Sequence, residues 1–284
     1  MTREGQLRQD IVEVGLRLYG RGYVASNDGN ISVRLDGERI LATPTGVSKG
    51  FMTPDMMVVT DMQGRKVAGH RDASTELKMH LAVYEMRPDV NAVVHAHPPL
   101  STGFAVAGIP LNKSSLAEII FSLGSVPIAE YATPSTQELP DAVKKYITAH
   151  DGLLLANHGA LTAGQDLMNA YFKMETMEHF AQITLVARQL GRENLISREE
   201  VDRLQGLRDF YGIKSPAPIC TDPAQASDAG TTCQFVDAPA SDGPRIVPSD
   251  IVPPGGGGRG EIRLTYRELA ALIADAVRQV TRDA

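Results

Sequence analysis

Hydrophobic residues near the start of the chain recur at helical spacing and then give way to short apolar runs. A first helix is predicted by residues that share one apolar face and stop before the breaker sequence GRGY: Leu7, Ile11, Val14 and Leu18. Strands are predicted at residues 29–35, 39–42 and 56–60, because Asp-Gly, Pro-Thr-Gly and Gln-Gly turn signals separate these runs. This region is therefore expected to be a helix followed by strands.

The alternation of helical and extended patterns continues to about residue 213. A helix is predicted from Ser74 to just before Pro88, since proline disfavours helix in the residue that precedes it. The apolar segments NAVVHAH (91–97) and GLLLANHG (152–159) predict buried strands, and helical patterns cover 167–190 and 198–210. We therefore expect residues 1–213 to form one mixed α/β catalytic domain.

The pattern changes after this domain. Residues 214–260 are rich in Pro, Gly, Ala, Ser and Asp and contain the run PPGGGG, which predicts a disordered, flexible linker. Residues 261–284 return to helical spacing, and Thr265 with Glu268 forms a capping box at the start of an amphipathic helix. Two cysteines, Cys220 and Cys233, lie in the linker, so no disulfide framework is indicated.

Composition excludes several classes of function. The 284 residues carry a formal net charge of -6, so no basic field for nucleic acid exists. No apolar run approaches the roughly 20 residues of a membrane span, and the N-terminus lacks the apolar core of a signal peptide. We expect a cytoplasmic globular enzyme.

Three histidines form the strongest candidate for chemistry. His95 and His97 lie two residues apart on a predicted strand, so both imidazoles project to one face and can approach one ion. His158 follows another apolar strand and precedes a glycine. Three histidines leave a position open on zinc, and such a site polarises a carbonyl as a Lewis acid. An isolated His-x-His pair is otherwise typical of structural histidines.

Polar residues in predicted turns add candidates for binding and proton transfer. Glu76 lies at the start of the helix that Ser74 and Thr75 open, where its carboxylate is placed either to complete a metal shell or to accept a proton, or merely complements the helix dipole. The same turn offers backbone N–H groups and two hydroxyls for a phosphate. Further turns contribute Asn30, Thr45 and Gly46.

Six segments together resemble the class II aldolase/adducin family, most closely its fuculose-phosphate-aldolase-like branch. They are SNDGNISVR, TPTGVSKG, ASTELKMH, NAVVHAHPP, PIAEYATPST and LLLANHGAL, within residues 5–213. The resemblance implies an α/β three-layer fold with a central, mainly antiparallel sheet flanked by helices. It also implies a homotetramer with active sites between subunits.

The resemblance assigns roles to the candidate residues. It implies that His95, His97 and His158 are zinc ligands, with Glu76 as the fourth ligand that leaves to act as acid/base. Imidazole and carboxylate ligands also accept Mn²⁺, Fe²⁺ or Co²⁺. The phosphate of a small phosphorylated sugar would be held by five residues: Asn30, Thr45, Gly46, Ser74 and Thr75.

The sequence departs from the family pattern at the residue that protonates the leaving aldehyde. The branch uses a tyrosine from a neighbouring subunit there, whereas the stretch KSSLAEIIFSLG has none. Glu118 in this stretch is a candidate proton shuttle or a solvated carboxylate. Tyr211, in RDFYGI, matches a C-terminal tyrosine that helps to close the site.

The resemblance predicts zinc-dependent cleavage of L-fuculose or L-rhamnulose 1-phosphate to dihydroxyacetone phosphate and lactaldehyde. The alternatives are a pentulose-phosphate 4-epimerase or another sugar-phosphate reaction at the same metal, and a non-catalytic adducin-like binding protein. The linker and helix at 214–284 resemble an encapsulation peptide that binds a bacterial microcompartment shell or co-cargo proteins, or form a helix that packs on its own oligomer.

Overall fold

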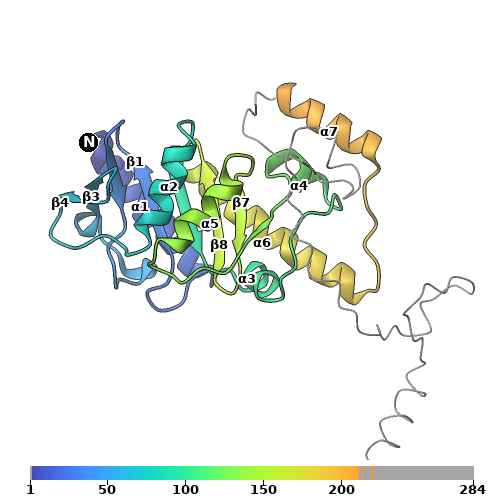
Figure 1. The fold of residues 1–284 in the computed structure, drawn as a ribbon, viewed down its shortest axis with the longest axis horizontal. Coiled ribbons are helices and arrows are strands. Elements are labelled where there is room, and N and C mark those ends of the chain that lie inside the picture. Colours follow the sequence, from blue (N-terminus) through green and yellow to red (C-terminus); the bar gives the residue numbers. More distant parts are fainter. Residues whose placement is uncertain (1, 211–212, 214–218, 220–284) are drawn as a thin grey trace, which may run out of the picture. The chain divides into compact units, whose positions relative to one another are not determined.

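A computed structural model describes residues 2–210, 213 and 219 of the chain (Figure 1). The predicted linker and C-terminal helix, together with Tyr211 and both cysteines, lie outside the described residues, apart from Ile219. Among the described helices, none is long and apolar enough to cross a membrane.

The described part is built on an eight-stranded sheet with the order β4-β3-β2-β1-β5-β8-β7-β6. Neighbouring strands are antiparallel except for the parallel pair β6 and β7. The strands are β1 (Asn30–Arg34), β2 (Arg39–Ala42), β3 (Val58–Asp61), β4 (Lys66–Ala68), β5 (Ala92–Ala96), β6 (Ile128–Ala129), β7 (Gly152–Leu155) and β8 (Gly159–Gly164).

Helices cover both faces of the sheet, which gives three layers (Figure 1). One face packs against α1 (Arg3–Gly20), α3 (Pro99–Val106) and α6 (Leu167–Gln189). The other packs against α2 (Leu77–Met86) and α5 (Glu138–Ile147). The remaining helices are α4 (Ala117–Ser122), which contacts α7 (Arg198–Phe210), and two short 3-10 turns, η1 (Lys49–Phe51) and η2 (Pro54–Met56).

Strand side chains alternate between two separate hydrophobic cores, as the pleat requires. In β5, Val94 joins the core under α1 and α6, whereas Val93 joins the core under α2 and α5. His95 is two residues beyond Val93 and therefore points to the α2 side. In β1, Ile31 faces α1 and α6, which leaves Asn30 on the α2 side.

The sheet and its helix layers confirm the predicted α/β fold. The predicted first helix and the strands at 30–34, 39–42 and 92–96 are present, and the 56–60 strand occurs as Val58–Asp61. The helix predicted from Ser74 begins at Leu77 instead, because the backbone N–H of Ser74 donates to Thr43 and keeps this residue beside β2. The structure also contains β4, β6, β8, α3, α4 and α5, which had not been predicted.

Candidate active site

Three histidines meet at one end of the neighbouring central strands β5 and β8. His95 lies on β5 and His97 directly after it, while His158 lies in the tight turn that joins β7 to β8. β5 pairs with β8 in a register that sets Ala96 opposite Ala160, so the turn carries His158 back to the end of β5. The candidate ligand nitrogens of the three rings lie within 4.8 Å of one another.

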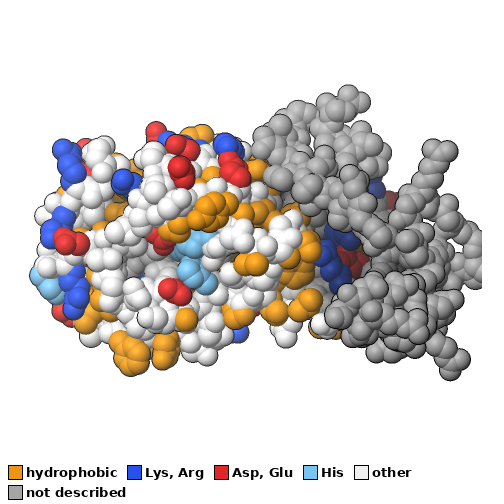
Figure 2. All heavy atoms as spheres, turned by 60° about the horizontal axis from the view of Figure 1, so that its bottom comes forward, with side chains coloured by type: hydrophobic (Ala, Val, Ile, Leu, Met, Phe, Trp, Pro, Cys, Tyr) orange, Lys and Arg blue, Asp and Glu red, His pale blue; other side chains and the backbone are white. Residues whose placement is uncertain are grey.

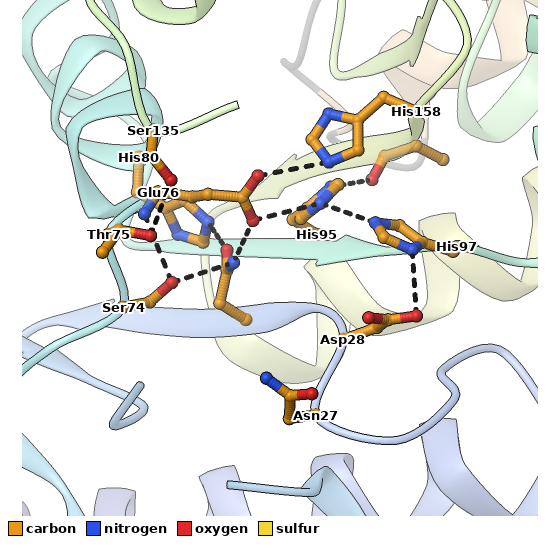
Figure 3. A network of polar contacts seen from close by, with 12 residues as sticks. Asn27, Asp28, Ser74, Thr75, Glu76, His80, His95, His97, Ser135 and His158 are labelled. Carbon is orange, nitrogen blue, oxygen red and sulfur yellow. Dashed lines mark hydrogen bonds and ion pairs between the residues drawn. The ribbon is translucent and has the colours of Figure 1, made fainter. Parts of the chain in front are cut away.

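The three rings converge on one point with their Nε2 atoms (Figure 3). His95 is fully buried, and its Nδ1 donates to the carbonyl of Ala160 at 2.8 Å, which turns Nε2 toward the other rings. The Nε2 atoms of His95 and His97 are 3.2 Å apart. His97 directs Nδ1 toward the Asp28 carboxylate at 3.4 Å, which orients this ring from its far side.

Glu76 approaches the cluster from the beginning of α2 (Figure 3). It occupies the residue before the first helical position, and its side chain is 14% exposed. One carboxylate oxygen lies 3.1 Å from Nε2 of His158 and the other 3.6 Å from Nε2 of His95. Burial disfavours the charged carboxylate, but the hydrogen bond with His158 and the nearby His95 outweigh it and hold the pKa of Glu76 well below its usual range.

The geometry of this donor set fits a divalent metal. Ligand nitrogens at about 2.0–2.1 Å from a tetrahedral zinc ion lie roughly 3.3 Å from each other. The spacing of His95 and His97 and the contacts of Glu76 with His158 and His95 are close to this value. Burial also lowers the pKa of His95 and of His97, which favours the neutral imidazole that binds metal.

A cavity of about 340 Å³ opens beside these groups. Figure 2 shows histidine side chains at the surface near the middle of the face that it displays. The cavity is lined by Glu76, His97 and His158, and by four residues predicted for the phosphate: Thr45, Gly46, Ser74 and Thr75. Asn30 also lines it, but its amide is bonded to Ser74 and Glu76. The arrangement joins a candidate metal centre to a pocket of hydroxyl groups and backbone turns.

Comparison with known proteins identifies the family. Residues 9–185 match the Class II Aldolase and Adducin N-terminal domain. The chain belongs to the class II aldolase and adducin family. It is 31% identical over 206 residues to 5-deoxy-D-ribulose 1-phosphate aldolase of Bacillus thuringiensis, and this match covers 72% of this chain and 96% of that protein.

Two further class II aldolase relatives indicate the range of the family. The chain is 32% identical over 178 residues to 3-oxo-tetronate 4-phosphate decarboxylase of Haemophilus influenzae, a match that covers 61% of this chain and 84% of that protein. A solved L-fuculose 1-phosphate aldolase superposes with a TM-score of 0.68 at 32% identity, over 72% of this chain and 97% of that one. The chain is therefore an enzyme with the class II aldolase fold, a fold whose aldolases depend on a divalent metal.

Of two further predicted residues, one lies away from the cavity and the other is outside the described part of the chain. Glu118 lies exposed in the first turn of α4 and does not line the cavity. Tyr211 lies outside the described residues. The sequence analysis predicts Glu118 as a proton shuttle and Tyr211 as a residue that helps to close the site, in active sites that lie between subunits.

Lys49 and Asp28 line the cavity but had not been predicted. Lys49 is 1% exposed, and its ammonium donates to the carbonyls of Asn27 at 3.0 Å and Val47 at 2.7 Å. Burial lowers the pKa of Lys49 to about 8, although the charges of Asp28 and Glu76 oppose this shift. Lysine is usually exposed, so only the position of Lys49 directly after the TPTGVS turn hinted at a role.

Proposed function

We propose that this enzyme cleaves a deoxyketohexose 1-phosphate, such as L-fuculose or L-rhamnulose 1-phosphate, to dihydroxyacetone phosphate and lactaldehyde. The observation that carries the proposal is the convergence of three histidines and Glu76 beside a pocket of hydroxyl groups that contains a buried ammonium. The resemblance in fold and sequence to an L-fuculose 1-phosphate aldolase supports the choice of substrate.

We propose His95, His97, His158 and Glu76 as the metal ligands. A bound Zn²⁺ would supply Lewis-acid polarisation of the substrate carbonyl, and Mn²⁺, Fe²⁺ or Co²⁺ would suit the same imidazole and carboxylate donors. The ligand spacings above support this assignment. Nδ1 of His158 is buried without a hydrogen-bond partner among the described residues, so this ring is oriented mainly through Nε2.

Proton transfer in the proposed reaction is balanced by two groups. A base accepts the proton of the carbinol hydroxyl, the neighbouring C–C bond breaks to release the aldehyde, and the electron pair passes to the ketone as an enediolate. Glu76, the proposed acid, would donate a proton to the enediolate carbon and be left as a carboxylate. Solvent would return the proton held by the base to Glu76, so that both groups recover their starting states. We propose Glu118 of a neighbouring subunit for the hydroxyl side, because it lies in KSSLAEIIFSLG, the stretch that corresponds to the family's tyrosine but contains none.

The phosphate end of the pocket is proposed to be formed by Thr45, Gly46, Ser74 and Thr75, together with Lys49. Hydroxyl and backbone N–H groups donate to phosphate oxygens, and the ammonium supplies a positive charge. Lys49 has no carboxylate within salt-bridge distance among the described residues. A buried cation of this kind is stabilised when an anion binds next to it.

A decarboxylase reaction is a second candidate, favoured by the 32% identity to 3-oxo-tetronate 4-phosphate decarboxylase. Loss of carbon dioxide from a 3-oxo acid and retro-aldol cleavage both leave an enediolate on a phosphorylated ketone, so one site can stabilise both. A pentulose-phosphate 4-epimerase would also break a C–C bond by retro-aldol cleavage, and would then re-form it by addition of the enediolate to the other face of the aldehyde. The complete set of metal-competent side chains argues against an adducin-like binding role.

Assembly and location complete the proposal. We propose a homotetramer with active sites between subunits, in which Tyr211 helps to close the neighbouring site. We also propose that residues 261–284 direct the enzyme to a bacterial microcompartment, where a reactive aldehyde product would be confined. If a chain truncated after residue 213 is still recruited to shell proteins as efficiently as the full chain, the targeting role is wrong.

The reaction is tested by measuring dihydroxyacetone phosphate released from L-fuculose 1-phosphate and L-rhamnulose 1-phosphate. Release from the zinc-loaded enzyme should stop with a chelator and in His95→Ala, but persist in His150→Ala. His150 is a matched control, since it is also buried but donates to Ser125 away from the cavity. Dihydroxyacetone phosphate formed only from 3-oxo-tetronate 4-phosphate would establish the decarboxylase instead.

A further inference from the structure

A line of buried polar side chains extends behind Glu76 into the domain. Asn30 Nδ2 donates to the Glu76 carboxylate at 2.8 Å, and Asn30 Oδ1 lies 2.5 Å from Nε2 of His80. On the other side of the ring, His80 Nδ1 lies 2.7 Å from the Ser32 hydroxyl, which is 2.9 Å from the hydroxyl of Tyr84. Apart from Glu76, every member is at most 3% exposed.

The periodicity of two elements creates this line. Glu76, His80 and Tyr84 recur every four residues and therefore share one face of α2. Asn30 and Ser32 are two residues apart on β1 and project to the same face of the sheet. Because α2 packs on β1, the two polar rows lie against each other, and each residue bonds to the opposite row.

The direction of each hydrogen bond can be deduced from the carboxylate. A charged Glu76 only accepts, so Asn30 must present its NH₂ group to it and its carbonyl to His80. His80 must then donate from Nε2. Burial lowers the pKa of His80 to about 4, so the ring is neutral and Nδ1 accepts from Ser32.

The remaining hydroxyl closes the line. Once the proton of Ser32 is used toward His80, the Ser32 oxygen accepts from Tyr84. Every bond in the line therefore donates toward Glu76, and bonds that point in one direction polarise one another. The second N–H of Asn30 donates to Ser74 at 3.2 Å. Both amide hydrogens of Asn30 are thus engaged within the protein, and neither is left for a substrate phosphate.

We propose that Asn30 and His80 are positioning residues that fix the rotamer of Glu76. By holding one carboxylate oxygen, they leave the other directed at the histidine cluster, where it lies 3.1 Å from His158. The side-chain amide of Asn30 thus orients the acid/base. The inference rests on the proposed metal-dependent function, and it assigns the orientation of Glu76 to two residues that are not themselves proposed metal ligands.

The alternative is that this line only satisfies buried polar groups. In that case, replacing His80 would lower stability but leave metal binding unchanged in the folded protein. Groups that orient metal ligands behave differently, because their loss typically costs about 10–100-fold in metal affinity or activity. Metal binding measured on folded variants therefore separates the two roles.

The test compares His80→Leu and His80→Gln with wild type, using Co²⁺ affinity and the visible absorption of the Co²⁺-loaded protein. We expect His80→Leu to bind Co²⁺ about 10–100-fold more weakly with an altered spectrum. His80→Gln should restore both, since a glutamine amide can donate to Asn30 and accept from Ser32. In cleavage assays, kcat should fall in His80→Leu while KM remains close to wild type.

His150→Leu is the matched control, because it removes another buried, hydrogen-bonded histidine outside the cavity. Equal Co²⁺ affinity and spectra in His80→Leu and His150→Leu would overturn the proposal. If His80→Leu does not fold, Tyr84→Phe is compared with Tyr146→Phe, and identical Co²⁺ binding in that pair overturns it too. Co²⁺ binding is read without any sugar, so a failure of the proposed reaction remains distinguishable.

Discussion

Gly159 offers a sharp test of how the histidine cluster is built. This glycine opens β8 directly after His158, and it does not have a positive φ. A methyl group added at Gly159 would lie 2.5 Å from Cδ2 of His97, 2.6 Å from the carbonyl oxygen of Ala96 and 3.3 Å from Cε1 of His95. Gly159→Ala is therefore a purely steric perturbation directed at two proposed metal ligands.

The size of the effect follows from these distances. Ordinary van der Waals contact begins at 3.4 Å, so the His97 ring must move by about 1 Å, while the Ala96 carbonyl is fixed by its place in the sheet. Overpacking of this kind costs about 1–3 kcal/mol of stability. A displacement of about 1 Å at a catalytic group can lower activity by roughly 10²-fold.

The assay measures Co²⁺ affinity, kcat/KM and urea unfolding for Gly159→Ala. We expect kcat/KM to fall about 10²-fold and Co²⁺ to bind more weakly, with the loss of stability kept within the range above. Gly103→Ala is the control, because a Cβ at this helical position meets nothing within 4 Å and should raise stability by about 0.5–1 kcal/mol. Wild-type Co²⁺ affinity and activity in Gly159→Ala would refute the steric reasoning.

Four further predictions test charged groups in the site and in the core. Inhibition of cleavage by inorganic phosphate should weaken as the pH rises through 8, because Lys49 then loses its proton, whereas Lys49→Met should bind phosphate weakly at every pH. The pKa of Lys49 is lower in the folded chain than its ordinary 10.5, so burial of the charged ammonium costs stability below pH 8. This cost is relieved between about pH 8 and 10.5, where the folded chain has lost the proton but the unfolded chain still holds it. In urea unfolding, the stability of wild type relative to Lys49→Met should therefore rise across that window. Glu76→Gln should keep its circular dichroism spectrum but lose at least about 10²-fold in kcat, and full activity would exclude an acid/base role. Asp151→Ala should lose about 3–5 kcal/mol in urea unfolding, since buried Arg87 and Lys173 lie 2.9 and 2.5 Å from this carboxylate; a loss under about 1 kcal/mol would contradict this.

The sequence predicted those elements whose packing produces a clear period. The first helix and the strand around Val93 bury one or both faces, so their apolar residues repeat visibly. β4 has three exposed residues and β6 only two residues, so neither carries a period. The helix α5 was missed although Leu139, Val143 and Tyr146 recur at helical spacing, and this signal was available in the sequence.

The candidate site was predicted where chemistry and strand geometry coincide. Two histidines on alternate positions of a buried strand must project together, and the structure brings them and His158 to one point. Lys49 could not be predicted in the same way, because its burial depends on carbonyls from two loops that only the fold brings together. The spacing of Glu76, His80 and Tyr84 was visible, but its meaning required the register of α2 against β1.

Sheet register explains why the proposed metal centre and the proposed binding pocket can vary independently. Asn30 is paired with His95 across β1 and β5, and Ala96 with Ala160 across β5 and β8. A change of register by one residue would turn these side chains to the opposite face, so the fold itself fixes the position of the proposed ligands. The cavity wall at Thr45 and Gly46, by contrast, belongs to a turn outside the strands. Relatives named as an aldolase and as a decarboxylase fit this division, because turns proposed to contact substrate can change while the strands and the start of α2 hold the proposed metal ligands in place.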